Sequence, residues 1–184
     1  MDREGPMGRT HLRISMALAA CLVALLVLPG AALAHDPGVT GPPGPVVADL
    51  AGHTIAVGEI PHWYCHDLDF PRIHCFATAA ELEHALATHQ SARPAGTAGA
   101  SIDLAIYADA NWQGGTTVIS QAYPDLGTIG WNDKISSFKV LNGVAGHFAT
   151  DIYNSGAYDY FAPYQLTTYV GNAWNDTFSS VYPG

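Results

Sequence analysis

The octapeptide WNDKISSF at residues 131–138 recurs as WNDTFSSV at residues 174–181. Five of the eight positions are identical, and the shared residues are a tryptophan, an asparagine, an aspartate and two serines. Asparagine, aspartate and serine offer neutral and anionic oxygen ligands, the kind that hard cations such as calcium prefer. The repeat therefore indicates an internal duplication in which each half ends in an oxygen-rich loop.

Around the two octapeptides, apolar residues recur at every second position. The alternation runs through Ile102, Leu104 and Ile106, through Phe138 and Val140, through Phe148, Thr150 and Ile152, and through Leu166, Thr168 and Val170. Short alternating strands separated by Gly, Asn, Asp and Pro are typical of an antiparallel β-sandwich rather than of helices or a parallel sheet.

Each half of the duplicated block also contains a pair of aromatic residues. YADANWQG places Tyr107 and Trp112 five residues apart and follows them with Gly114, and YNSGAYDY places Tyr153 and Tyr158 at the same interval. On this alignment the second copy has Tyr160 where the first has its glycine. That position usually requires a backbone conformation that is costly for a residue with a Cβ, so we expect the second hairpin to be rearranged.

The hairpins and octapeptides resemble those of the microbial βγ-crystallins. In that family each half of a double Greek key carries an aromatic-x4-aromatic-x-Gly hairpin and an [N/D][N/D]xx[S/T]S calcium motif. Residues 132–137 and 175–180 both match the calcium motif in full. The resemblance covers about 101–184. It implies an all-β fold with a βγ-crystallin-like double Greek-key sandwich at the C-terminus. The residues before this block, which the resemblance does not cover, predict a small disulfide-bonded segment with one short helix.

In that family two calcium ions lie side by side, and each draws ligands from both motifs, so the resemblance implies two Ca²⁺ here. By position it implies carboxylate ligands at Asp133 and Asp176 and hydroxyl ligands at Ser136 and Ser179. It implies backbone carbonyl ligands at Lys134, Thr177, Ala108 and Asn154. It also implies that Asn132 and Asn175 orient the two loops. With one carboxylate per loop, the expected dissociation constant is about 10⁻⁵–10⁻³ M. The alternative is that Asn-Asp and Ser-Ser only form turns and that Trp131 and Trp174 are core aromatics.

The chain of 184 residues is acidic, with a formal net charge of −9. This excess argues against binding to nucleic acid or anionic lipid, both of which require clusters of Lys and Arg. It is compatible with cation binding, and equally with a charge that only keeps an exported protein soluble. The sequence contains no G-x-S-x-G, HExxH, Walker or dinucleotide motif, so we predict that the chain is not an enzyme.

The first 34 residues have the features of a signal peptide: a basic head, an apolar run and the small-residue site AALA at 31–34. We therefore expect that the protein is exported, is extracellular and is not held at a membrane after cleavage. The alternative is a lipoprotein signal at Cys21.

Four further parts follow the predicted signal peptide: a Pro/Gly spacer at 35–45, a compact segment at 46–90, a small-residue linker at 91–100 and the duplicated block at 101–184.

The compact segment contains Cys65 and Cys75, the only cysteines after the predicted leader. In an oxidising compartment two cysteines ten residues apart are expected to form one disulfide. The alternative is a Cys2His2 zinc site that also uses His66 and His74. The stretch that follows opens with a capping box at residues 78–81 and predicts a short helix.

Two other classes of function stay open. Small secreted actinobacterial peptidase inhibitors and killer-toxin-like proteins are similar to the same double Greek key. An inhibitor, whose partner would be an extracellular protease, should present an exposed rigid loop, and the disulfide loop 65–75 is the candidate because the block 101–184 has no cysteine. The third class is a matrix or cell-surface binding module that uses Tyr153, Tyr158, Tyr160 and Tyr164. The sequence does not predict the oligomeric state.

Overall fold

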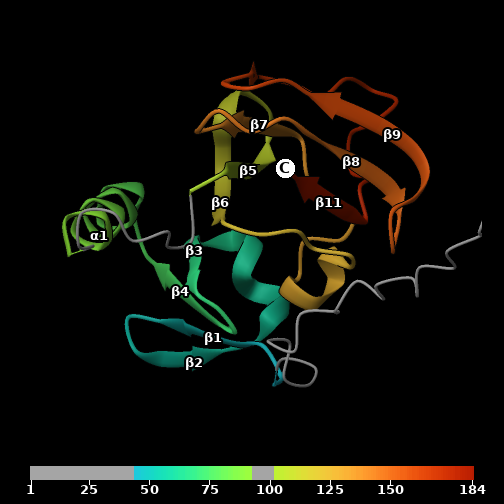
Figure 1. The fold of residues 1–184 in the computed structure, drawn as a ribbon. Helices are drawn as coiled ribbons and strands as arrows, with labels where there is room; N and C mark the ends of the chain where they lie inside the picture. The colour runs from blue at the N-terminus through green and yellow to red at the C-terminus, as the bar shows by residue number, and fades with distance from the viewer. Residues whose placement is uncertain (1–43, 93–101) are drawn as a thin grey trace, which may run out of the picture. The chain divides into compact units, whose positions relative to one another are not determined.

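The structure is a computed structural model that describes residues 44–92 and 102–184. The predicted signal peptide, most of the spacer and most of the linker lie outside the described residues. Within the described ranges no helix combines the length and apolar character that crossing a membrane requires. Two β-sheets, one α-helix and three short 3-10 helices make up this part of the chain (Figure 1).

The elements follow one another in two groups. Residues 44–92 contain β1 (Val47–Leu50), β2 (His53–Ile55), the 3-10 helix η1 (Val57–His62), β3 (Tyr64–Asp69), β4 (Arg72–Phe76) and α1 (Ala79–Ala92). Residues 102–184 contain β5 (Leu104–Asp109), η2 (Ala110–Trp112), β6 (Gln113–Ile119), η3 (Leu126–Ile129), β7 (Ser137–Val140), β8 (Gly146–Asp151), β9 (Ser155–Phe161), β10 (Leu166–Thr167) and β11 (Ser180–Pro183).

The two halves of the C-terminal block exchange a strand, and this exchange makes the block a double Greek key. In the first half β5 pairs with both β6 and β7, and β10 from the second half pairs with β7. In the second half β8 pairs with β9 and β11, and Tyr123 from the first half bridges Val181 of β11. The predicted all-β, βγ-crystallin-like double Greek-key sandwich is therefore confirmed.

The core lies where the apolar faces of the two sheets meet. Leu104, Ile106 and Phe138 contribute from the first sheet, and Phe148 and Val181 contribute from the second. The alternation seen in the sequence predicts these positions because opposite faces of a strand carry alternate residues. Three members of the alternating set are exposed instead: Ile152 lies at a hairpin tip, Leu166 lies in the two-residue edge strand β10, and Thr168 follows that strand.

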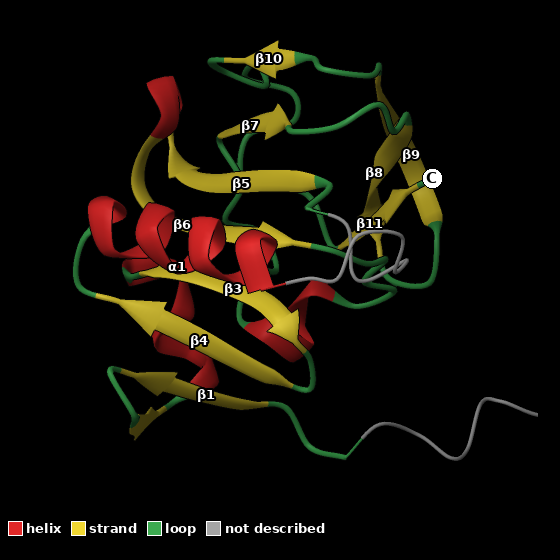
Figure 2. Ribbon diagram, turned by 60° about the vertical axis from the view of Figure 1, so that its left-hand side comes forward, coloured by secondary structure: helices red, strands yellow, loops and turns green. Residues whose placement is uncertain are grey.

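The compact segment shares a sheet with the C-terminal block. Strand β3 pairs in parallel with β6, and β4, β1 and β2 extend the sheet to the order β10-β7-β5-β6-β3-β4-β1-β2. Helix α1 lies across the face of this sheet that points away from the sandwich core (Figure 2). Its Leu82 packs with Ala105 and Val118, so the sheet is buried on both faces here. Residues 46–90, predicted from the sequence as a segment of their own, are therefore joined to the crystallin-like block by hydrogen bonds between β3 and β6.

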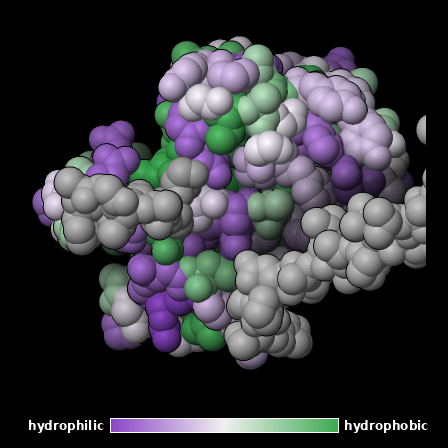
Figure 3. Space-filling model, viewed as in Figure 1, coloured by the Kyte–Doolittle hydropathy of each residue, from purple (hydrophilic) through white to green (hydrophobic). Residues whose placement is uncertain are grey.

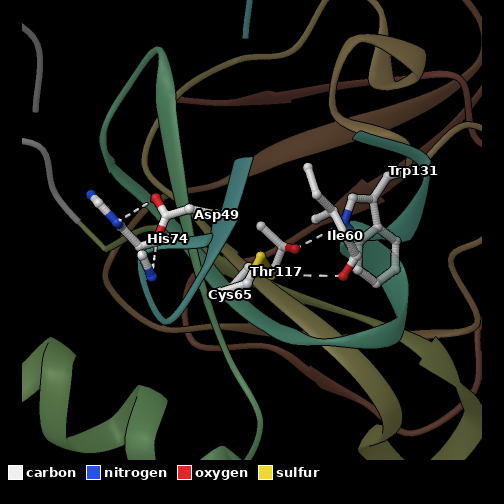
Figure 4. The surroundings of a disulfide bond; sticks show 8 residues. Asp49, Ile60, Cys65, His74, Thr117 and Trp131 are labelled. Atoms are coloured by element: carbon white, nitrogen blue, oxygen red, sulfur yellow. Dashed lines mark hydrogen bonds and ion pairs between the residues drawn. A yellow bond between two sulfur atoms is a disulfide. The ribbon is translucent and has the colours of Figure 1, made fainter. Parts of the chain in front are cut away.

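Cys65 and Cys75 lie opposite each other on β3 and β4, and they form the predicted disulfide in the buried interior (Figure 4). This pairing excludes the alternative zinc site, because neither sulfur remains as a thiolate. The predicted helix is confirmed as α1. The backbone N–H of Thr78 donates to the Glu81 carboxylate at 3.0 Å, and the Glu81 N–H donates to Thr78 Oγ1 at 3.3 Å, which is the predicted capping box.

Candidate metal centre

The two octapeptide loops are cross-linked by a mirrored pair of backbone hydrogen bonds. The N–H of Asp133 donates to the carbonyl of Phe178 at 3.0 Å, and the N–H of Asp176 donates to the carbonyl of Ile135 at 3.3 Å. Both aspartates have left-handed backbones, with φ of 55° and 56°. Aspartate tolerates this region better than most residues do. The loops therefore lie side by side in the same conformation.

Within each loop an amide holds the neighbouring carboxylate. Asn132 Nδ2 donates to Asp133 Oδ2 at 2.6 Å, and Asn175 Nδ2 donates to Asp176 Oδ2 at 2.6 Å. Each contact fixes one carboxylate oxygen and leaves the other free to accept a cation. Both aspartates are exposed to solvent. The arrangement agrees with the orienting role that the resemblance implies for the two asparagines.

Backbone hydrogen bonds also bring together loop residues from different halves. The N–H of Ser136 donates to the carbonyl of Tyr107 at 3.0 Å, which places Ser136 beside Ala108. The bond from Asp176 to Ile135 places the second loop beside the same serine. One set therefore consists of Ala108, Ser136, Asp176 and Thr177. The mirrored set is fixed by the 2.9 Å bond from the Ser179 N–H to the Ala149 carbonyl, and it consists of Thr150, Ser179, Asp133 and Lys134.

The structure corrects the register of the second hairpin. In the first hairpin the ladder shifts after Tyr107 and resumes where Asp109 opposes Gln113. In the second hairpin it shifts after Ala149 and resumes where Asp151 opposes Ser155. When the two hairpins are aligned on these irregularities, Asp109 corresponds to Asp151. The alignment of Tyr107 with Tyr153, which was predicted from the sequence, differs from this register by four residues.

Two predictions change with this register. Gly156, with φ of 81°, occupies the position of Gly114, with φ of 74°, so Tyr160 does not replace a required glycine. The residue that occupies the position of Ala108 is Thr150, and Asn154 corresponds to Trp112 instead. Asn154 makes a side-chain contact of 2.6 Å with His147 on the outer face of the second sheet. Thr150, and not Asn154, is therefore the counterpart of Ala108 in the second hairpin.

The last serine of each motif has a role that the sequence analysis missed. Ser137 Oγ donates to the carbonyl of Asp109 at 2.6 Å, and Ser180 Oγ donates to the carbonyl of Asp151 at 2.8 Å. Each serine thereby ties its motif to the bend of a hairpin. The spacing Asp-x4-Gly, which both hairpins share at 109–114 and 151–156, could have revealed the correct register.

The chain is similar to known proteins at the level of solved structures. No protein-family model and no curated protein matches the chain. Among solved structures, a βγ-crystallin domain from Clostridium beijerinckii is 24% identical over 44% of this chain and 95% of that domain, with a TM-score of 0.40. A βγ-crystallin from an archaeon is 27% identical over 45% of this chain and 96% of that one, with a TM-score of 0.40.

The strand exchange and the paired hairpins decide the fold of the C-terminal block. Its fold is that of a βγ-crystallin-like double Greek key. A βγ-crystallin domain from Flavobacterium johnsoniae likewise matches 46% of this chain and 94% of its own length, at 22% identity and a TM-score of 0.40. These matches span nearly the whole of each solved domain and less than half of this chain.

The donor chemistry of the crystallin-like domain is that of hard oxygens. Among the residues that the structure describes, no three His, Cys, Asp or Glu side chains gather closely enough to hold a metal. Each of the two sets of residues described above instead offers one carboxylate together with hydroxyl and carbonyl oxygens. Lys134 places a positive charge next to Asp133, whereas the second loop has the uncharged Thr177 at that position. A cation held by Asp133 would therefore meet more repulsion than one held by Asp176.

We expect Gly156→Ala to lower the free energy of unfolding by about 2 kcal/mol, because a left-handed backbone is costly for alanine. A Cβ at this residue would also lie 2.3 Å from Thr150 Oγ1. Tyr160→Gly, at an exposed site, should change the free energy of unfolding by less than about 0.5 kcal/mol beyond the cost of placing glycine in a strand. Urea unfolding of both variants provides the measurement. A larger loss in Tyr160→Gly than in Gly156→Ala would restore the register predicted from the tyrosine spacing.

Proposed function

We propose that the chain is an exported calcium-binding protein without enzymatic activity, in which two Ca²⁺ ions stabilise the βγ-crystallin-like domain. The observation that carries this proposal is the duplicated loop geometry. Asp133 and Asp176 have matching left-handed backbones, matching bonds to the opposite loop and matching contacts from the preceding asparagine. Turn formation alone does not require that a carboxylate be held in the same way twice.

The residues present fit two calcium sites. One ion would take the carboxylate of Asp176, the carbonyls of Thr177 and Ala108 and the hydroxyl of Ser136. The other would take the carboxylate of Asp133, the carbonyls of Lys134 and Thr150 and the hydroxyl of Ser179. Four protein oxygens per ion leave two to four positions for water, since calcium takes about six to eight oxygen ligands.

Calcium bound in this way would contribute to folding. At about 1 mM free calcium and a dissociation constant of about 10⁻⁴ M, each ion stabilises the native state by roughly 1.4 kcal/mol. That is a useful fraction of the 5–15 kcal/mol typical of a whole domain. The proposed role of the ions is therefore to make the stability of the exported protein depend on the extracellular medium.

The disulfide supports the proposed export. Disulfides persist in oxidising compartments and are rare in the cytosol. Cys65 and Cys75 are bonded and buried, which fits folding outside the reducing cytosol. The same geometry gives less support to an inhibitor, because the bond joins two paired strands in the interior, and between the two cysteines only the tight turn at residues 69–72 reaches the surface.

The test is a calorimetric calcium titration together with thermal melts in calcium and in EDTA. We expect two binding events in the wild-type chain and a higher melting temperature in calcium. Ser136→Ala combined with Ser179→Ala should weaken binding about tenfold or more by removing one ligand from each ion. Ser91→Ala, on α1 and remote from the loops, serves as the matched control. Absence of binding heat and of any melting shift would reduce the octapeptides to turn-forming scaffold.

A further inference from the structure

Three histidines meet where helix α1 covers the first sheet. His66 of β3 lies opposite His74 of β4 in the strand register, and their ring centroids are 5.5 Å apart. His89 of α1 lies above them, with its ring centroid 6.5 Å from that of His66. Phe76 of β4 contacts the His66 ring at 5.8 Å, and His66 is only 5% exposed. We call His66, His74 and His89 the histidine cluster.

The contacts of His66 favour an uncharged ring. Its Nδ1 accepts a hydrogen bond from the Leu68 N–H at 3.4 Å, so the neutral ring carries its proton on Nε2. A second proton must therefore be added at Nδ1, directly against that N–H. On the other side of β3, β6 places the uncharged Val118 opposite His66. Burial, with a further contribution from His74, lowers the pKa of His66 to about 4.

The nearby carboxylates contact His74 instead of His66. Asp49 Oδ2 lies 3.0 Å from His74 Nδ1 (Figure 4), and Asp69 Oδ2 lies 3.4 Å from His74 Nε2. Asp49 also pairs with Arg72 at 3.7 Å. Figure 3 shows strongly hydrophilic side chains gathered over β1, β2 and β4, the strands that carry these charges. In the described part of the chain no carboxylate forms an ion pair with His66, so a positive charge there would lack a direct partner.

The strands on either side of the cluster cannot move apart. The disulfide between Cys65 and Cys75 joins β3 and β4 one residue away from the pair formed by His66 and His74. Repulsion between protonated histidines therefore cannot be relieved by separating the two strands. It can be relieved only on the side of the cluster that α1 covers.

Helix α1 is held to the sheet by few side chains. Leu82 is the only buried residue of its 14. Leu86 and His89 are half-buried and follow Leu82 at helical spacing, so His89 ends the stripe that faces the sheet. The other charged or titratable residues of α1 are exposed, and they are Glu81, Glu83 and His84. The helix is therefore the element that can leave the cluster at the lowest cost.

We propose that α1 is an acid-released cover of the sheet, in which protonation of the histidine cluster shifts the docked helix toward release. Release opens the outer side of His66 to water and removes His89 from its neighbourhood, so an imidazolium at His66 becomes solvated. The sheet face that α1 leaves carries Tyr64, Ala105 and Val118, an apolar surface that is covered at neutral pH. The proposal does not depend on calcium.

The size of the shift follows from proton binding. The released state takes up a proton at His66 near pH 6.5, whereas the docked state resists protonation until about pH 4. Acid therefore favours the released state, and the equilibrium constant for release should rise about 20-fold between pH 7 and pH 5.

The test is hydrogen exchange of the full-length chain at pH 7 and pH 5, in the same excess of calcium and at several low concentrations of urea. Amides of α1 should exchange through an opening that depends weakly on urea and is more frequent than global unfolding. Amides of β5 and β6 should exchange more slowly, with the urea dependence of global unfolding. Between pH 7 and pH 5 the protection factors of α1 should fall about 20-fold.

Three variants isolate the cluster. His66→Asn should remove most of the fall in α1 protection. His89→Asn, at a half-buried site that tolerates an amide, should make the fall smaller and keeps the test available if His66→Asn does not fold. His84→Asn is the matched control, since His84 is exposed on the same helix, and it should show the wild-type fall.

Several results would overturn the proposal. Unchanged α1 protection between pH 7 and pH 5 is one of them. Equal protection and equal urea dependence for α1 and β5 at pH 5 would mean that acid unfolds the whole chain instead. A wild-type fall in both His66→Asn and His89→Asn would assign the effect to other groups. In EDTA the fall should persist, and its loss would tie the release of α1 to the octapeptide loops.

Discussion

Replacement of Gly115 by alanine is expected to destabilise the protein by about 3 kcal/mol, at the upper end of the usual cost of overpacking. Gly115 lies in β6 against the backbone of η1, and a Cβ there would be 1.9 Å from the Pro61 carbonyl oxygen and 2.9 Å from the His62 carbonyl carbon. Both neighbours are backbone atoms, so no side-chain rotation can relieve the clash. The loss should appear as a lower midpoint in urea unfolding.

Gly58→Ala provides the matched control for this prediction. Gly58 lies in η1 itself, and a Cβ there would meet no atom within 4 Å. We expect its effect to stay within about 0.5 kcal/mol of the wild type. Equal stabilities for the two variants would contradict the close packing of the compact segment against the crystallin-like domain.

Acidification from pH 7 to pH 4 is expected to remove about 3 kcal/mol of stability through His66 alone. Burial, which is the largest cause, and the neighbouring His74 lower the pKa of His66 to about 4, with a smaller contribution in the same direction from His89. The carboxylates of Asp69 and Asp49 act in the opposite direction. The His66 ring is neutral in the fold, where its Nδ1 accepts a bond from the Leu68 N–H at 3.4 Å.

The sign follows from proton binding. The unfolded chain binds a proton at this histidine below about pH 6.5, whereas the native chain resists protonation until about pH 4. Stability is therefore complete above pH 6.5 and falls as the pH falls between these two values. Asp67 contributes in the opposite direction, because burial raises its pKa. A comparison of variants is needed to isolate His66.

His66→Asn supplies that comparison, because its amide oxygen can replace Nδ1 as the acceptor for Leu68. Urea unfolding at pH 7 and pH 4 should show that the wild type loses about 3 kcal/mol more than this variant. Any contribution from Asp67 is common to both proteins. His84→Asn, at an exposed position on α1, should retain the wild-type pH dependence. If it flattened the pH profile as His66→Asn does, His66 would not be the group responsible.

The second hairpin shows where sequence reasoning reached its limit. The tyrosines at 153 and 158 repeat the spacing of the first aromatic pair, yet the structure aligns the hairpins on Gly114 and Gly156. An aromatic residue can serve on many surfaces, so its spacing constrains the backbone weakly. A left-handed bend favours glycine strongly. An alignment of the two hairpins on their glycines would therefore have identified Thr150, instead of Asn154, as the counterpart of Ala108.

No comparable sequence pattern indicates that the compact segment pairs with the crystallin-like domain. Strand β3 pairs with β6 through backbone groups, and Tyr64 lies opposite Thr116 in the ladder. Backbone hydrogen bonds are the same for every residue except proline, so a strand does not encode its partner. The alternating pattern encodes only which face of a strand is buried.

The sequence by itself determined the duplicated Greek keys, the disulfide between Cys65 and Cys75 and the capped helix, because each depends on local spacing, on residue chemistry or on a repeated motif. Only the tertiary structure decided which residues meet. It brought Asp176 beside Ser136, placed α1 over the sheet and set His89 beside His66. Such contacts join residues far apart in the chain, and their register is set by packing and strand pairing across the whole fold rather than by any local pattern.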